Sequence, residues 1–171
     1  MPTFIRLADG AFSLVEDAFT AVADDQPVPP GDVIISLTRF QTEGGALLSE
    51  GRQVGVRLAS DEDVEVLAYD LPRVAVVALA FPVFGDGRAY SSVRLLRERF
   101  QFKGEVRAVG GVLCEQAVQM VRCGFDAFEP ADGSTVEDWA RAAQRFRHVY
   151  QRSSDGRSPA FAERTGEVRG D

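Results

Sequence analysis

The strongest constraint on the fold is a regular alternation of two kinds of segment that begins at Gly51. Short apolar runs, which predict strands, are separated by amphipathic stretches of about ten or more residues, which predict helices. The predicted strands are residues 53–59, 74–81, 105–110 and 125–129, and the predicted helices are residues 61–71, 89–100, 113–124 and 135–150. This spacing is typical of βαβ units, which form a parallel sheet with right-handed crossovers.

The predicted fold class is therefore α/β, with a small parallel sheet of about four βα units. The run at 74–81 is apolar without alternation, which indicates a central strand that is covered on both faces. The same number of units makes about half of a (βα) barrel, so a partial barrel is the alternative architecture.

The chain is predicted to have three parts. Residues 1–32 form an N-terminal hairpin arm, which turns at Asp9-Gly10, and a proline-rich linker. Residues 33–150 form the α/β domain, which starts with a predicted helix at 35–51 that Gly44-Gly45 weakens. Residues 151–171 are rich in Ser, Gly and Arg and short of apolar residues, which predicts a disordered tail.

Composition excludes several classes of function. The net charge of −7, from 26 acidic and 19 basic residues, disfavours nucleic-acid binding. The longest apolar run, residues 74–84, is too short to cross a bilayer, and the N-terminus lacks an apolar leader, so we expect a cytoplasmic protein without a membrane partner. Cys114 and Cys123 are too few for a disulfide framework, and no residues have metal-ligand spacing, so we expect reduced thiols, no metal and no cofactor.

The best candidate site is the loop after the strand at 74–81, because ligands of parallel sheets bind at the carboxyl ends of the strands. This loop carries Asp86, Gly87 and Arg88, and Tyr90 and Ser91 follow. Backbone donors, a helix N-terminus, hydroxyl groups and a guanidinium together suit an oxyanion. Turn and capping chemistry explains Asp86, Gly87 and Ser91 equally well, but it does not require Arg88.

The next loop contains Gly110-Gly111 and Cys114. The glycines lack the rest of a phosphate-binding motif, and tight packing of helix on sheet explains them better. Cys114 would be a reactive thiol at the start of a helix or, as the commoner alternative, a small buried residue. His148 is the single histidine and lies near the end of the last predicted helix, which makes a catalytic Cys–His or Ser–His pair improbable.

Three stretches of the chain resemble a bacterial family known as domain of unknown function nine-three-four. They are FPVFGDGRAYSSVRLLRER (81–99), GEVRAVGGVL (104–113) and RCGFDAFE (122–129). The family pattern carries Asp86, Gly87, Arg88, Arg107 and Gly110. It usually has a polar residue at the position of Gly111 and often an arginine at that of Cys114, which puts a catalytic role for Cys114 in doubt.

The resemblance implies an accessory role in sulfate assimilation, because genes of this family tend to lie beside those of sulfite or nitrite reductase. We therefore expect an accessory protein of assimilatory sulfate and sulfite reduction. It would bind a partner reductase or a small sulfur oxyanion through the Asp86-Arg88-Ser91 loop. The expected binding residues are Asp86, Gly87, Arg88, Tyr90, Ser91, Arg107 and Gly110.

Two alternatives stay open. The chain would be an oxidoreductase that acts on a small anionic sulfur substrate with a cofactor supplied by a partner. Arg88 would then bind the anion, Asp86 would orient Arg88 or accept a proton, and Tyr90 or Ser91 would donate hydrogen bonds. In the other alternative, Asp86 and Arg88 are structural and pair with each other or with Arg107 and Asp126.

Overall fold

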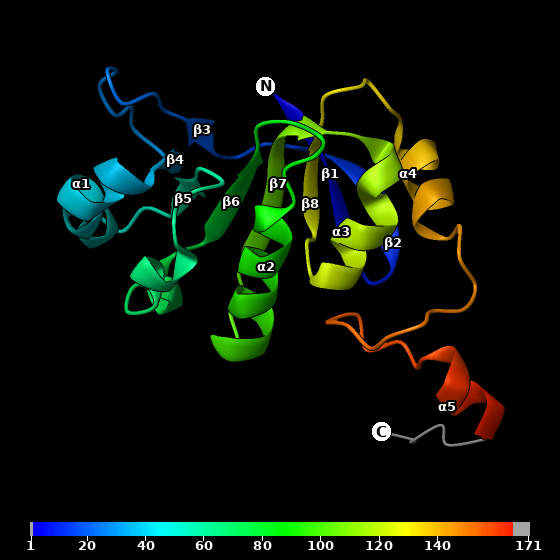
Figure 1. The fold of residues 1–171 in the computed structure, drawn as a ribbon. Helices are drawn as coiled ribbons and strands as arrows, with labels where there is room; N and C mark the ends of the chain where they lie inside the picture. Colours follow the sequence, from blue (N-terminus) through cyan, green and yellow to red (C-terminus); the bar gives the residue numbers. More distant parts are fainter. Residues whose placement is uncertain (1, 166–171) are drawn as a thin grey trace.

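One eight-stranded sheet organises the computed structural model, which describes residues 2–165 (Figure 1). The strands are β1 (Thr3–Ala8), β2 (Ala11–Glu16), β3 (Thr20–Ala21), β4 (Val33–Ser36), β5 (Val54–Leu58), β6 (Val76–Phe81), β7 (Glu105–Val112) and β8 (Ala127–Pro130). The α-helices are α1 (Leu37–Ser49), α2 (Arg88–Arg94), α3 (Ala117–Cys123), α4 (Val136–Ala143) and α5 (Ala160–Thr165). Short 3₁₀ turns lie at Val64–Leu67, Leu71–Arg73 and Cys114–Gln116, and a π-helical turn at Leu95–Arg99 extends α2.

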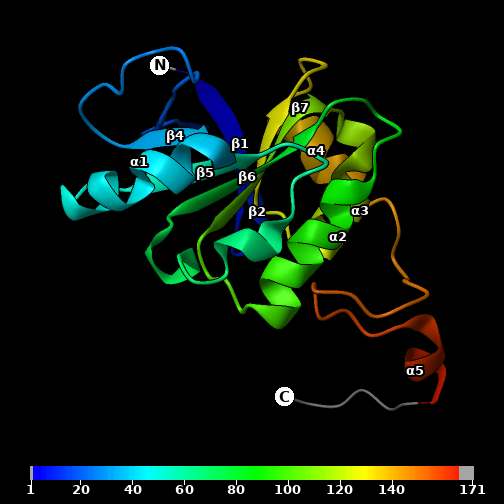
Figure 2. The same cartoon turned by 60° about the vertical axis from the view of Figure 1, so that its left-hand side comes forward.

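The strand order is β2-β1-β8-β7-β6-β5-β4-β3. Strands β3 to β8 are parallel and lie in sequence order, whereas β1 runs antiparallel to β8 and β2 antiparallel to β1. A right-handed crossover to the adjacent strand each time places the connecting helices on one face. Figures 1 and 2 show α1, α2, α3 and α4 on that face. The α/β class is confirmed, and the mixed sheet forms a half-barrel, the architecture of the partial-barrel alternative.

The four strands predicted from Gly51 onward correspond to β5, β6, β7 and β8. The N-terminal hairpin is also present, and Asp9 and Gly10 both have positive φ, as its tight turn requires. Three predictions are wrong in detail. The helix predicted at 135–150 is shorter, since α4 ends at Ala143. Residues 61–71 form two 3₁₀ turns instead of one long helix, and the predicted helix at 35–51 begins at Leu37 because the residues before it form β4.

The length of one connection shows how strongly the sheet curls. Strands β2 and β3 lie at opposite edges, yet only residues 17–19 join Glu16 to Thr20, a span of at most about 14 Å. In a flat sheet, seven spacings of about 4.8 Å would separate these edges by roughly 34 Å. The sheet must therefore curl, and residues 17–19, which we call the crossing segment, pass over the face that carries no helix.

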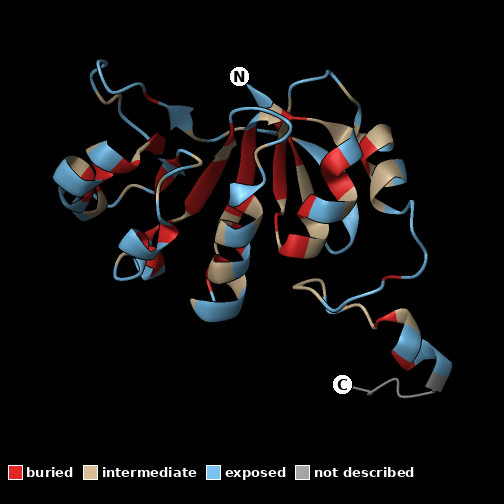
Figure 3. Cartoon of the chain, viewed as in Figure 1, coloured by how far each residue is buried: buried red, intermediate tan, exposed pale blue. Residues whose placement is uncertain are grey.

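The main core lies between the sheet and the helices (Figure 3). Val77, Leu79 and Phe81 of β6 point into it and are at most 3% exposed. The other side of β6 is also buried, because Phe19 of the crossing segment packs against a small cluster that includes Val76. β6 is thus covered on both faces, as its unbroken apolar sequence predicts, but the second cover is a chain segment and not a helix.

Arg107 of β7 holds the crossing segment against the helix-free face. Its guanidinium is 1% exposed and donates hydrogen bonds to Asp17 at 2.5 and 3.1 Å. It also pairs with Glu105 at 2.8 Å and Glu129 at 3.1 Å, and it lies over the Phe4 ring at 4.1 Å. Burial by itself would lower the pKa of Arg107. The hydrogen bond that Arg107 donates to Asp17 and the negative charge of Glu105 outweigh the effect of burial, so the pKa lies above its ordinary value. Arg107 is therefore a permanent buried cation that connects three chain segments.

The chain after α4 returns toward the helices. Arg122 of α3 pairs with Asp155 at 3.1 Å, and the Ser154 hydroxyl donates to Glu98 at 2.9 Å. Figure 1 shows this returning segment below α3, leading to α5. The division of the chain at residues 32 and 150 stays a prediction, and residues 166–171 of the predicted tail lie outside the described residues. None of the described helices has the length and apolar character that a bilayer span requires.

Replacing Arg107 by Met should destabilise the fold by about 3–5 kcal/mol, because the carboxylates around it would stay buried without a cation. The measurement is the free energy of unfolding in urea. Arg57→Met is the matched control, since Arg57 lies on the same face in register with Ala78 and Arg107 but is exposed and has no hydrogen bond or ion pair with the described residues. Equal stability of the two variants would contradict a structural role for Arg107.

Candidate functional site

The loop between β6 and α2 contains the predicted site and is built around Asp86. One carboxylate oxygen of Asp86 accepts hydrogen bonds from the Arg88 backbone N–H at 3.2 Å and from Nε at 3.0 Å. The other accepts from a terminal nitrogen of Arg88 at 2.6 Å. The same Arg88 nitrogen donates to the Ser60 hydroxyl, at 2.8 Å, in the loop after β5. The Asp86–Arg88 pair therefore fastens two neighbouring loops at the carboxyl edge of the sheet.

This pairing fixes the charge of both groups. Hydrogen bonds from Arg88 and Ser60 hold the pKa of the Asp86 carboxyl well below its usual range. The contact with Asp86 also raises the pKa of Arg88 above its ordinary value. Asp86 is thus ionised throughout the neutral range and suited to orient Arg88, and it is a poor proton acceptor.

The tip of this loop is apolar, which the sequence reasoning missed. Val83 and Phe84 are 62% and 57% exposed, although both side chains are large and apolar. They directly precede the Asp86–Arg88 pair, and Arg88 is itself 59% exposed. The sequence held a signal for this tip, because the apolar run continues to Phe84 although the strand β6 ends at Phe81.

Gly110 pairs with Phe81, the last residue of β6, and allows β6 and β7 to lie close together where the loop begins. Its φ is +92°, and a Cβ built on it would lie 2.6 Å from the Phe81 carbonyl oxygen. The pairing of β7 with β8 also shifts register between Ala108 and Val112. Gly110 is thus a packing residue, but it packs against the backbone of the neighbouring strand, whereas the sequence pattern predicts packing of helix on sheet.

Tyr90 points between α2 and α3. Its ring makes edge contacts with Phe81, at a centroid distance of 5.3 Å, and with Phe125, at 6.4 Å. Burial raises the pKa of Tyr90, although a hydrogen bond with Gln116 opposes the shift. Ser91 is exposed on α2 and lines a hollow, together with Tyr90, that does not include Arg88.

The structure does not bring Arg107 to this loop. Arg107 lies on the helix-free face of β7 with Asp17, whereas the loop leads into a helix on the opposite face. Asp126 pairs with Arg97, at 2.7 Å, and not with Arg88. Of the structural pairings considered from the sequence, the structure contains the ion pair between Asp86 and Arg88.

Neither cysteine has the environment of an activated thiol. Both are free, and Cys123 is buried. Burial and the nearby Asp132 charge raise the pKa of the Cys114 thiol. Across residues 2–165 there is no group of three or more His, Cys, Asp or Glu side chains that could hold a metal ion.

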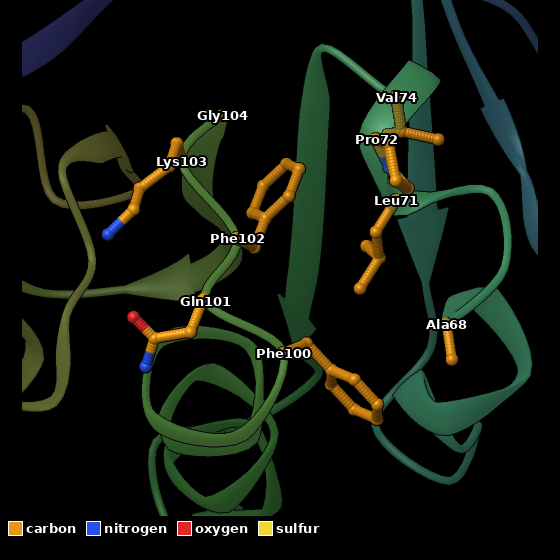
Figure 4. A pocket seen from close by; sticks show the side chains of 9 residues that line it. All are labelled: Ala68, Leu71, Pro72, Val74, Phe100, Gln101, Phe102, Lys103 and Gly104. Carbon is orange, nitrogen blue, oxygen red and sulfur yellow. The ribbon is translucent and has the colours of Figure 1, made fainter.

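A second hollow, of about 320 Å³, lies at the opposite end of the strands from the predicted site. Figure 4 shows Leu71 and Phe100 facing each other across it, whereas Gln101 and Lys103 point away. It follows the π-helical turn at Leu95–Arg99, and Gln101 has a positive φ of 54°. Its lining is mainly apolar and offers few groups for chemistry.

A comparison with protein-family models gives a match over residues 55–161 to a family described as "Bacterial protein of unknown function (DUF934)". This match confirms the resemblance drawn from the sequence. It includes the loop from Asp86 to Ser91 and also Arg107 and Gly110, but not β1 to β4. The comparison with curated proteins gives no match.

Replacing Gly110 by Ala should destabilise the protein by about 1–3 kcal/mol, because a side chain is strained at positive φ and would meet the Phe81 carbonyl. Gly111→Ala is the control. Its Cβ would lie 3.2 Å from the same oxygen, and its φ is not in the left-handed region, so its cost should be smaller. Thermal unfolding of both variants measures the difference. A Gly111→Ala variant that is less stable than Gly110→Ala would contradict this role of Gly110.

Proposed function

The chain belongs to the bacterial DUF934 family, whose function is unknown, and from that premise we propose that it is an accessory binding protein of assimilatory sulfate and sulfite reduction. In this proposal the loop from Val83 to Arg88 docks on a partner reductase. The link to a reductase rests on the resemblance drawn from the sequence. The docking surface rests on the exposed groups of the loop.

One observation carries the docking proposal, namely that two large apolar side chains protrude beside an immobilised arginine. Exposed aromatic groups and arginine are the residue types that dominate binding energy at protein interfaces. Asp86 and Ser60 already hold Arg88 in place, so little side-chain freedom would be lost when a partner binds.

The same geometry gives less support to an oxyanion site or a catalytic site at this loop. Asp86 and Ser60 engage Nε and one terminal nitrogen of Arg88, and the Asp86 carboxylate already balances the charge of the guanidinium, so an anion would have to compete with that carboxylate. Asp86 stays ionised at neutral pH and is a poor base. Tyr90 packs against aromatic rings, and Ser91 lies in a different hollow.

Replacing Phe84 by Ser should weaken binding to purified sulfite reductase by about tenfold or more, because an exposed aromatic anchor would be lost. Biolayer interferometry with the immobilised reductase measures the affinity. Phe146→Ser is the matched control, since Phe146 is 54% exposed, compared with 57% for Phe84, and lies outside the loop. A wild-type protein that does not bind the reductase would refute the proposed partner. Equal binding by the two variants would refute the docking loop.

Growth of a deletion strain gives an independent test of the pathway. The strain should grow more slowly than its parent with sulfate as the sulfur source and equally well with cysteine. A chain that carries Phe84→Ser should restore growth on sulfate less well than one that carries Phe146→Ser. Equal growth of the deletion strain and its parent on both sulfur sources would oppose a role in sulfate assimilation.

A further inference from the structure

An arginine-rich hollow of about 290 Å³ lies between α2, α3 and the segment that follows α4. Three chain segments contribute polar groups to it. The ones that matter here are Ser91 and Arg94 of α2, Gln119 and Arg122 of α3, and Arg152 and Ser153 of the returning segment. Apart from Ser91, none of these residues belongs to the site predicted from the sequence.

The hollow is positively charged in a chain whose net charge is −7. None of the described residues that line it is acidic. Arg94 pairs with Glu98 at 3.1 Å and Arg122 with Asp155 at 3.1 Å, but both carboxylates lie outside the lining. Arg152 has neither a hydrogen bond nor an ion pair with any described residue. One full positive charge in the hollow is therefore uncompensated.

Helix electrostatics explains only part of this arrangement. Arg122 lies in the last turn of α3, where a cation favours the negative end of the helix dipole, whereas the π-helical turn continues α2 beyond Arg94. Arg152 comes from a segment that is not part of either helix, and the dipoles do not require it. The three arginines come together because the returning segment folds against α2 and α3.

Several hydrogen-bond donors in the hollow are free. Glu98 takes two of the three guanidinium nitrogens of Arg94, through contacts at 3.1 and 3.3 Å. Asp155 and the Gln151 carbonyl take two of those of Arg122. Within residues 2–165 no partner engages the hydroxyl groups of Ser91 and Ser153. Guanidinium and hydroxyl donors that converge without an acceptor match the oxygens of a tetrahedral anion.

We propose that this hollow binds a small tetrahedral oxyanion, either a free phosphate or sulfate ion or the phosphate group of a small phosphomonoester. Its volume of about 290 Å³ lies near the lower end of the range for ligand sites, which suits a small anion. The site is separate from the docking loop and does not depend on the proposed reductase partner. Because α2, α3 and the returning segment all line it, a bound anion would also fasten that segment to the helices.

The test is a titration of the full chain with sodium phosphate, sodium sulfate and glycerol 3-phosphate, with sodium chloride at equal ionic strength as the reference. Thermal unfolding and calorimetry measure binding. We expect saturable stabilisation by at least one of the three anions and none by chloride. Tighter binding of glycerol 3-phosphate would assign an organic phosphate as the ligand, and equal binding of all three would assign the free tetrahedral ion.

Arg152→Ala should weaken the affinity for the bound anion by about tenfold, because a charge-assisted hydrogen bond is lost. Arg57→Ala is the matched control, since it also removes an exposed arginine without a partner and leaves the net charge the same as in Arg152→Ala. Arg152 is exposed and has no hydrogen bond or ion pair with a described residue, so its variant should unfold near the wild-type temperature when no anion is added. The absence of saturable binding would overturn the proposal, and so would an equal loss of affinity in the two variants.

Discussion

The buried guanidinium of Arg107 is the contact on which the arrangement of the sheet depends. A singly wound parallel sheet has helices on one face only, and its other face would expose apolar side chains such as Val76 to water. The crossing segment covers this face, and the hydrogen bonds between Arg107 and Asp17 hold it there. Because that segment is short, it also requires the two edges of the sheet to approach each other. The ion pair between Arg107 and Asp17 therefore has two effects: it keeps the crossing segment on the helix-free face, and it keeps the two edges of the curled sheet close together.

The parallel order of the strands determines which loops can form a shared site. They bring the loops after β5 and β6 to one edge, where Arg88 joins them through Asp86 and Ser60. The pairing makes the loop rigid and fully charged, and these properties favour recognition of a partner over proton transfer. The arginine-rich hollow between α2, α3 and the returning segment differs from this loop, because Arg152 has no ion pair with a described residue and one nitrogen each of Arg94 and Arg122 is free of such partners. The two surfaces that we propose for binding are therefore separate, one apolar and one cationic.

Much of the fold could be predicted because apolar periodicity is a local property of the chain. The strands β5 to β8 and the N-terminal hairpin follow from short windows of sequence. The strand β4 was missed because its four residues run directly into α1 without a turn. The predicted helix at 61–71 fails because its segment breaks into two 3₁₀ turns, the second with a proline in its first turn. At the candidate site, Asp86 and Arg88 were found, but the exposure of Phe84 and the convergence of Arg94, Arg122 and Arg152 were not.

By itself, the sequence determined the α/β class, the N-terminal hairpin, the strands β5 to β8, the membership of the family and the loop that carries Asp86 and Arg88. These follow from periodicity, turn chemistry and a local pattern of residues. Only the tertiary structure decided that Arg88 binds Asp86, that Arg107 is a buried support on the opposite face, and that three distant arginines line one hollow. Side-chain partners depend on how segments far apart in the sequence come together, as Asp17 and Arg107 do across 90 positions, and no local window contains that information.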